Sequence, residues 1–177
     1  IGDPLTLVLV AVVAGVWLAR RRSIAAGLAP VAALLAASVT ETAMKQVVGR
    51  GRPPAFARLL TETDPSFPSG HTTGTAALFM TIALVAIPAL KTRTARLVVG
   101  LAAGTVAAAV GLARMVLGVH WLTDVAAGWL LGSAWAIGVT LLLPSAERRL
   151  VDRPARTRPD QMAARSASAR TSSADAG

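Results

Sequence analysis

Two long stretches almost without charge constrain the fold of this chain more than any other feature. Residues 72–90 hold no Lys, Arg, Asp or Glu, and residues 97–143 hold only Arg114 and Asp124. Apolar segments of this length are typical of membrane-spanning helices, because a charged side chain is costly in a bilayer core. The chain is 54% hydrophobic and 15% charged, whereas an average soluble domain is about 25% charged. The sequence therefore excludes a soluble globule and a disordered chain.

Five apolar runs predict an all-α, integral-membrane helical bundle. The first run, Leu5 to Ala19, gives only about 22 Å of helix, whereas a hydrocarbon core is about 30 Å thick. A signal peptide is disfavoured, because the positive charges follow this run instead of preceding it. Gly100 and Gly104 form a G-x-x-x-G pair that favours close helix packing. The runs are 5–19, 24–44, 72–90, 97–117 and 121–143.

The composition changes at the end of the last run. We assign residues 1–146 to the membrane domain and residues 147–177 to a disordered basic tail, because the tail has almost no large apolar residue to bury. The chain begins at Ile1 without Met. We therefore expect a preceding segment to be missing from this sequence.

The distribution of positive charge predicts the orientation. Placing Arg20–Arg22 in the cytoplasm also puts Lys91–Arg96 and the tail there, and these segments hold 13 of the 18 Lys and Arg residues. This follows the rule that positive loops stay inside. Five cations remain outside, where the rule does not favour them, so they need another explanation. They are Lys45, Arg50, Arg52, Arg58 and Arg114. The net charge of +9 could indicate nucleic-acid binding, but most of it lies in short loops and the tail, which favours the membrane interpretation.

Both histidines of the chain fall on this predicted outer side. His71 lies at the start of the third run and His120 just before the fifth. Asp124 is four residues after His120, so the two share a helix face. Together with Lys45 and Arg52 after the second run and Arg114 at the end of the fourth, they form a pattern typical of a phosphate-ester site. Arginine pairs with phosphate oxygens in a bidentate way, and lysine adds a point charge.

Smaller features support this interpretation. Ser69 is a good N-cap, and Gly70 lets the backbone of a helix start approach an anion closely. Glu41 lies one turn before Lys45 and is expected to pair with it. Arg50 and Arg58 are expected to reach the membrane interface or to bind lipid headgroups. The absence of Cys excludes disulfides and thiolate chemistry.

Three motifs, in order, resemble those of the type 2 phosphatidic acid phosphatase (PAP2) superfamily. The first is Lys45, six residues, then Arg52-Pro53, and the second is Pro68-Ser69-Gly70-His71. The third is Ser-Arg, five residues, His, three residues, Asp in the family. In this chain Arg114, His120 and Asp124 match that motif at the same spacing, but Ala113 stands at the position of the serine. We expect one weakened phosphate contact there. The resemblance spans residues of about 40–143.

The resemblance implies a role for each motif residue. His120 would be the nucleophile that forms a phosphohistidine, and Asp124 would hold its other ring nitrogen. His71 would protonate the leaving oxygen and then activate water. The phosphate-binding residues would be Lys45, Arg52, Ser69, Gly70 and Arg114. The family uses no metal, so no cofactor is expected. A six-span pattern in the family also implies that the first span is missing here.

The resemblance predicts a multi-pass enzyme of the inner or plasma membrane that acts on a lipid phosphate at its outer face. Undecaprenyl diphosphate ranks first as substrate, because the site faces outward. Alternatives are a phosphatidylglycerophosphate or phosphatidic acid phosphatase, and a lipid phosphotransferase. A soluble vanadate haloperoxidase is disfavoured by the spans. A non-catalytic protein that binds anionic lipid would need the cations but not two histidines with a paired Asp. The oligomeric state stays open.

Overall fold

The structure, a computed structural model, describes the backbone of residues 2–151 and the side chains of residues 2–142. Residues 1–144 form one compact unit, and residues 145–177 form a second one. The predicted disordered tail lies mostly outside the described residues, so its disorder stays a prediction. The description below concerns the first unit.

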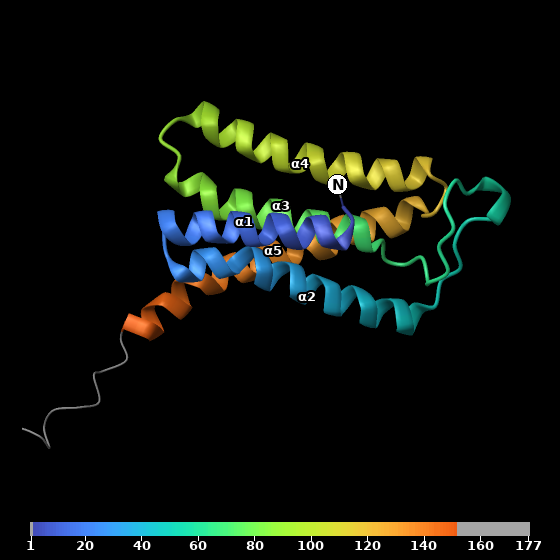
Figure 1. The fold of residues 1–177 in the computed structure, drawn as a ribbon, viewed down its shortest axis with the longest axis horizontal. Coiled ribbons are helices and arrows are strands. Elements are labelled where there is room, and N and C mark those ends of the chain that lie inside the picture. Colours follow the sequence, from blue (N-terminus) through green and yellow to red (C-terminus); the bar gives the residue numbers. More distant parts are fainter. Residues whose placement is uncertain (1, 152–177) are drawn as a thin grey trace, which may run out of the picture. The chain divides into compact units, whose positions relative to one another are not determined.

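Five long helices build this unit, and they confirm the predicted all-α bundle. Each is long and apolar enough to cross a membrane. Short turns join α1 to α2 and α3 to α4 at one end of the bundle, while the loop of residues 49–69 and the α4–α5 turn lie at the other (Figure 1). The helices are α1 (Pro4–Arg21), α2 (Ile24–Val48), α3 (Gly70–Ala86), α4 (Arg93–Val116) and α5 (Leu122–Val151), with short 3₁₀ turns η1 (Ala55–Ala57) and η2 (Ile87–Ala89).

Local capping sets the first two helices. The side chain of Asp3 accepts a hydrogen bond from the N–H of Thr6, and Pro4 occupies the first turn of α1, where a missing N–H costs nothing. α1 continues through Arg21, two residues past the end of the first apolar run at Ala19. α2 likewise runs past the predicted end at Met44 and stops at Gly49, which has a φ of 58°. Lys45 therefore lies on the last turn of α2 instead of after it.

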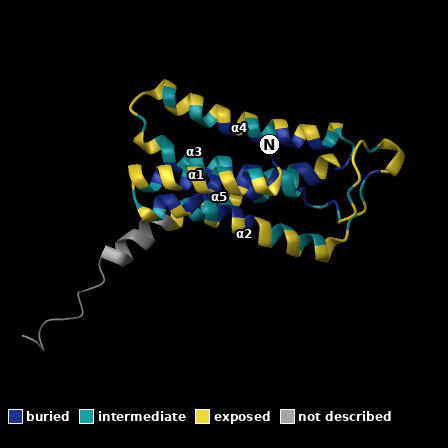
Figure 2. Ribbon diagram, viewed as in Figure 1, coloured by how far each residue is buried: buried dark blue, intermediate teal, exposed yellow. Residues whose placement is uncertain are grey.

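α3 is the central helix. It contacts α1, α2 and α4, and 56% of its span is buried, compared with 22% for α1 and for α4. Figure 2 shows the same contrast, with exposed residues on the outer faces of the other helices. Buried hydroxyls on α3 bond within the helix: Thr73 donates to the Ser69 carbonyl and Thr81 to the Ala77 carbonyl. A helix surrounded in this way needs no charged side chain, which explains its uncharged sequence.

Two glycines of α5 allow it to lie directly on α3. A Cβ atom at Gly132 would lie 2.4 Å from the Thr73 carbonyl oxygen, and one at Gly128 would lie 3.0 Å from the Ser69 carbonyl oxygen. Close packing at Gly100 and Gly104 was predicted instead, and this was wrong. A Cβ atom at Gly104 would meet nothing within 4 Å among the described residues, because Gly104 borders a cavity of about 220 Å³ that side chains of α3 and α5 also line.

The outer surface of the bundle is apolar. Leu5, Val13, Leu130 and Leu141 are each at least 70% exposed. In water so many exposed large side chains would drive aggregation, whereas in a bilayer they contact lipid chains. The exposed apolar surface therefore agrees with the five spans.

Candidate active site

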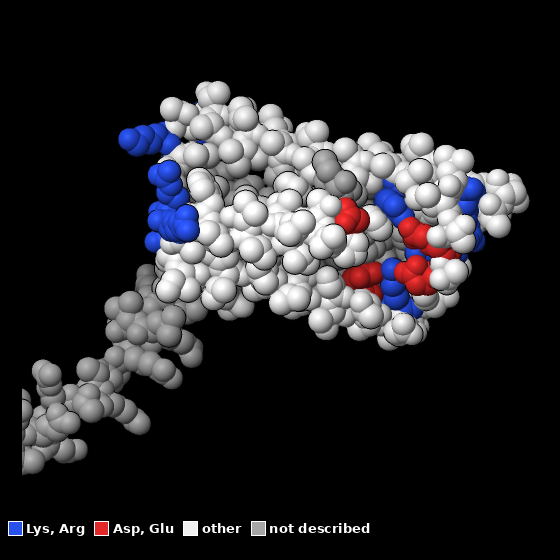
Figure 3. Space-filling view, in the orientation of Figure 1, with Lys and Arg blue, Asp and Glu red and all other residues white. Residues whose placement is uncertain are grey.

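The charged side chains gather at the two ends of the bundle in different ways. At the end with the α1–α2 and α3–α4 turns, Lys and Arg side chains cluster with no acidic neighbour among the described residues (Figure 3). At the other end, basic and acidic side chains lie interleaved around a hollow (Figure 3). All the residues predicted to bind or attack phosphate belong to this second end.

His120 and Asp124 form a buried pair at the start of α5. The exposed fraction of His120 is 4% and that of Asp124 is 0%, and 3.5 Å separate Nδ1 of His120 from Oδ2 of Asp124. This distance is longer than a normal hydrogen bond. Catalytic hydrogen bonds are often long in an empty site and tighten when substrate binds. The predicted pairing of these two residues is therefore present in a loose form.

The turn after α4 presents the His120 ring to the site. α4 ends at Val116, and Gly118 follows with a φ of 69°, a conformation that favours glycine. Nε2 of His120 then lies 3.2 Å from Nη1 of Arg52. Because a guanidinium can only donate, Nε2 must be the acceptor and the ring proton lies on Nδ1, toward Asp124. In this tautomer the lone pair lies on Nε2, where it accepts from Arg52 in this structure and would have to be released for attack.

Burial and the neighbouring cation also keep this ring neutral. Burial lowers the pKa of His120, and the Arg52 guanidinium lowers it further, while Asp124 and Glu62 act in the opposite direction. The net result is a pKa of about 4, well below the ordinary value of about 6.5. His120 is therefore uncharged at neutral pH, as a nucleophile must be.

Asp124 has a partner that the sequence did not indicate. Nη1 of Arg50 lies 2.9 Å from Oδ1 of Asp124, and the backbone N–H of Trp121 donates to Oδ2 at 2.9 Å. The Arg50 guanidinium also stacks over the Trp121 ring, 5.7 Å from its centroid. The prediction that Arg50 only reaches the membrane interface or a lipid headgroup was therefore wrong. It neutralises a buried carboxylate that would otherwise be costly.

The three predicted phosphate-binding cations converge from three parts of the chain. Lys45 comes from the last turn of α2, Arg52 from the loop and Arg114 from the last turn of α4. Only 14%, 3% and 9% of these side chains, respectively, is exposed. The predicted pair of Glu41 and Lys45 is confirmed, with 2.9 Å between the carboxylate and the ammonium group.

Ser69 and Gly70 make contacts that the sequence did not indicate, and their role in phosphate binding stays a prediction. Ser69 occupies the N-cap of α3, but its hydroxyl makes no capping bond and instead accepts from Thr72 at 3.0 Å. Its backbone N–H donates to the Asp124 carbonyl at 3.1 Å, which joins the starts of α3 and α5. At Gly70 a Cβ atom would lie 2.8 Å from Oε1 of Glu41, so only glycine leaves room for that carboxylate.

One cavity of about 330 Å³ connects these groups with the interior of the bundle. Its polar end holds both histidines together with Lys45 and Arg52. Its apolar end lies between α1 and α2 and is lined by Leu7, Val8, Leu34 and Leu35. Cavities of this size with few polar groups and an apolar wall are typical of small-molecule sites.

The Ala113 position borders a second cavity beside the first. Ala113, Arg114 and His71 line it, and its volume is also about 330 Å³. Nε of Arg114 is buried and has no hydrogen-bond partner among the described residues. A guanidinium N–H in this state can donate to an oxygen of a bound anion. The expected weakening of one phosphate contact by Ala113 stays a prediction.

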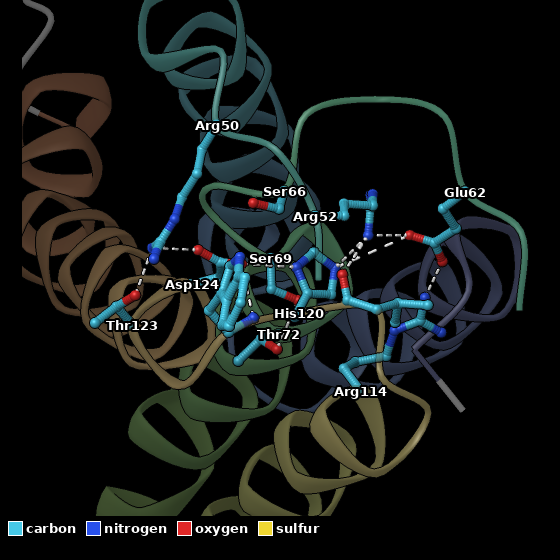
Figure 4. Close-up of polar contacts among 12 residues, drawn as sticks. Arg50, Arg52, Glu62, Ser66, Ser69, Thr72, Arg114, His120, Thr123 and Asp124 are labelled. Atoms are coloured by element: carbon cyan, nitrogen blue, oxygen red, sulfur yellow. Dashed lines mark hydrogen bonds and ion pairs between the residues drawn. The ribbon is translucent and has the colours of Figure 1, made fainter. Parts of the chain in front are cut away.

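The structure adds two acidic residues that the sequence analysis missed. Glu62 bridges Arg52 and Arg114 (Figure 4), and Asp64 bridges Lys45 and Arg52. Burial alone would raise the pKa of Asp64, but its hydrogen bond to Lys45 and the charges of Lys45 and Arg52 hold that pKa below the usual value. Charge balance could have revealed both, because buried cations need anions and these are the two acidic residues between the first two motifs.

The bundle of helices long enough to span a membrane carries two histidines and a cluster of cations at one end. These features define an integral-membrane protein with a site suited to phosphate. Comparison with known proteins places the chain within that class. The PAP2 superfamily matches residues 26–148, which is more than half of the chain. The protein belongs to the PAP2 superfamily.

Two relatives from Bacillus subtilis make the similarity more specific. The chain is 39% identical over 90 residues to phosphatidylglycerophosphatase B of strain 168, a match that covers 50% of this chain and 44% of the relative. It thus spans less than half the length of that curated relative. The chain is also similar to the crystal structure of a transmembrane PAP2 type phosphatidylglycerolphosphate phosphatase. That match has a TM-score of 0.70 and 29% identity, and it covers 89% of this chain and 74% of the other.

Proposed function

We propose that the protein is a membrane lipid phosphatase that hydrolyses a phosphate monoester of a lipid. The observation that carries this proposal is the single cavity that holds both histidines and two of the cations at one end and apolar side chains of α1 and α2 at the other. A phosphate group suits the first end and an acyl or prenyl tail suits the second. A water-soluble phosphate ester would have no use for the apolar end.

The geometry supports a two-step reaction. Nε2 of His120 attacks phosphorus while the bond to the lipid oxygen breaks, and His71 supplies the proton that the leaving lipid alkoxide takes. His71 then removes a proton from water, which attacks the phosphohistidine and releases inorganic phosphate with His120 restored. Lys45, Arg52 and Arg114 stabilise the negative charge on the phosphoryl oxygens in both steps.

Asp124 supports the nucleophile through its charge. When Nε2 bonds to phosphorus, the imidazole becomes positive, and a buried carboxylate at Nδ1 stabilises this form. Before the reaction begins, the Arg50 guanidinium already pairs with the Asp124 carboxylate at 2.9 Å. Because the fixed cations already supply the charge that a metal would bring, we propose that activity needs no divalent metal and no cofactor.

The names of the two relatives favour phosphatidylglycerophosphate as the first substrate to test, ahead of undecaprenyl diphosphate. The decisive experiment measures phosphate release from the detergent-solubilised full chain in EDTA. The panel contains phosphatidylglycerophosphate, phosphatidic acid and undecaprenyl diphosphate, with glycerol phosphate as the tail-free control. We expect release from at least one lipid and little from the control. Binding of lipid without release would favour the non-catalytic alternative, and transfer of phosphate to an added alcohol would favour a phosphotransferase.

We propose that the site faces outward, because the exposed cations at the opposite end suit the cytoplasmic side. The chain has no Cys, so single-Cys labelling can test this directly. A Cys at the exposed position Thr61, in the loop of the site, should react with an impermeant maleimide in intact spheroplasts. A Cys at Thr94, at the start of α4, should react only after lysis. The reverse pattern would place the site in the cytoplasm.

A further inference from the structure

The cations assigned to phosphate are already paired with carboxylates. Glu62 contacts Arg52 and Arg114, and Asp64 contacts Arg52 and Lys45. Both acids come from one short stretch of the loop between the first two motifs. All three cations are thus held by anions that belong to the chain itself; Figure 4 shows the two that contact Glu62, Arg52 and Arg114.

One of these carboxylates stands where the phosphoryl group would react. Oε2 of Glu62 lies 4.0 Å from Nε2 of His120, with the Arg52 guanidinium in contact with both groups. A reacting phosphorus must approach the nucleophile to about 3–3.5 Å, and its oxygens must take the same guanidinium N–H groups. The carboxylate of Glu62 and a bound phosphate therefore cannot occupy the site together.

The loop is attached through its backbone, so the two carboxylates can leave by rotation of their side chains. Nε of Arg52 donates to the Asp64 carbonyl at 2.8 Å, and two further backbone contacts flank the acids. On one side, the N–H of Leu59 donates to the Leu117 carbonyl at 3.0 Å, and on the other, the N–H of Ser66 donates to the Arg50 carbonyl at 2.9 Å. The exposed fraction of the Asp64 side chain is 51% and that of Glu62 is 22%. Both carboxylates border water, so their release does not strand a charge in an apolar environment.

Two of the cations have supports other than these acids. Arg52 also donates to the Val119 carbonyl at 2.9 Å, and Lys45 keeps its pair with Glu41. With Glu62 and Asp64 withdrawn, Glu41 would balance one of the three positive charges. The remaining charge matches a phosphate monoester, which carries about −1.5 to −2 at pH 7. The acids are thus not needed to hold Lys45 and Arg52 in place.

We propose that Glu62 and Asp64 form an internal anion that competes with phosphate for Lys45, Arg52 and Arg114. This inference rests on the proposed function, because it assigns the same site to phosphate. A lipid substrate displaces the two carboxylates with the help of the binding energy of its tail. Inorganic phosphate has no tail, so the returning carboxylates weaken its binding. The pair therefore limits inhibition by the released product.

The test measures binding of inorganic phosphate to the full chain in detergent by titration calorimetry. The double variant Glu62→Gln/Asp64→Asn should bind phosphate about tenfold more tightly or better, because each competing charge-assisted contact is lost. Glu62→Gln alone should have the larger share of the effect, since Asp64 is more exposed. Unchanged affinity, or weaker affinity because Arg114 is no longer positioned, would overturn the proposal.

Two controls separate charge from other effects. Thr61→Ala/Thr63→Ala changes exposed neighbours in the same loop that do not line the cavity, and it should leave the phosphate affinity unchanged. Glu62→Asp keeps the charge and should stay nearer to the wild type than Glu62→Gln. Turnover is measured in parallel. If lipid phosphate is hydrolysed normally and the double variant binds inorganic phosphate as the wild type does, only this inference is refuted. If the affinity for phosphate changes but neither the wild type nor any variant releases phosphate from a lipid, the proposed function is refuted.

A second measurement keeps the proposal testable if the double variant does not fold. A spin label on a single Cys at Thr63, between the two acids, should become more mobile when phosphate or vanadate binds to the otherwise unchanged chain. Unchanged label mobility at saturating vanadate would show that the carboxylates stay in place, and it would overturn the proposal.

Discussion

The two ends of the helical bundle both gather cations, but only one of them buries and pairs these charges. Arg20, Arg21, Arg22, Lys91, Arg93 and Arg96 at the first end are all exposed. At the second end, Arg52 is 97% buried and contacts two carboxylates. Exposed cations interact with water and headgroups at little cost, whereas a buried cation is costly unless it is paired. Cations that are buried despite this cost indicate a site, and exposed ones indicate orientation in the membrane.

The largest effect that would test this comparison is the loss of the nucleophile. We expect His120→Ala to reduce turnover by roughly 10⁴-fold or more, as for other catalytic nucleophiles. Binding of inorganic phosphate should change by only a few-fold, because the cations remain. Phosphate release and titration calorimetry on the same preparation check both expectations. Turnover like that of the wild type would remove His120 as the nucleophile.

The next effect compares a cation from each end. Arg52→Lys should lower kcat/KM by about 10²-fold, because lysine cannot donate to a phosphate in a bidentate way. The matched variant at the other end, Arg21→Lys, should leave kcat/KM unchanged. Both are measured as phosphate release from the lipid that the panel identifies. Similar losses in the two variants would mean that the ends do not differ in the way proposed here.

A smaller effect concerns the partner of Asp124. Arg50→Gln should lower kcat about tenfold with little change in KM, because Asp124 keeps its bond to the Trp121 N–H but loses its counter-ion. Arg50→Lys should restore part of the activity. Arg58→Gln is the matched control, since the Arg58 guanidinium donates to the Pro53 carbonyl instead of to a carboxylate. An equal loss in the control would assign the effect to the loop as a whole.

The smallest effect is a shift in titration. The chain holds only two histidines, so NMR of labelled imidazoles can follow both, with His71→Ala for assignment. His120 should titrate near pH 4, and Arg52→Gln should raise this value by removing a nearby positive charge. Because the pKa of the folded state is lowered, the neutral ring stabilises the fold above the unfolded value of about 6.5, and this contribution is lost as the pH falls toward 4. A titration near 6.5 in the wild type would contradict the structure.

The sequence predicted the parts of the molecule that repeat or cluster along the chain. The spans follow from runs such as residues 72–90. The gathering of His71, His120 and Asp124 at one end follows from short motifs with fixed spacing, while their catalytic roles stay predictions. The pairing of Arg50 with Asp124 could not be predicted in this way, because it joins residues 74 positions apart and has no periodic signal. The prediction of close packing at Gly100 and Gly104 was wrong for a related reason. A pair of small residues shows that another helix can approach there, but not that its side chains fill the space beside the pair.

The two acidic residues of the site could not be predicted from the sequence for a similar reason. Glu62 and Asp64 lie in a loop with no helical or alternating pattern, and nothing nearby in the sequence indicates where their side chains point. A count of charges on the predicted outer side would have raised the question of what balances the cations. Only the folded loop shows that Glu62 reaches Arg114, which is 52 positions away.

The glycine pair on α5 has a consequence for how this protein can vary. Gly128 and Gly132 let α5 lie against the backbone of α3, and those two helices carry His71 at one start and Asp124 at the other. Any larger side chain at either glycine would push the helices apart and so move His71 away from the pair of His120 and Asp124. In a mutational scan these two positions should therefore tolerate change as poorly as the active site, although neither lines the cavity. The distance between the starts of α3 and α5 is therefore set by two glycines in the first turns of α5.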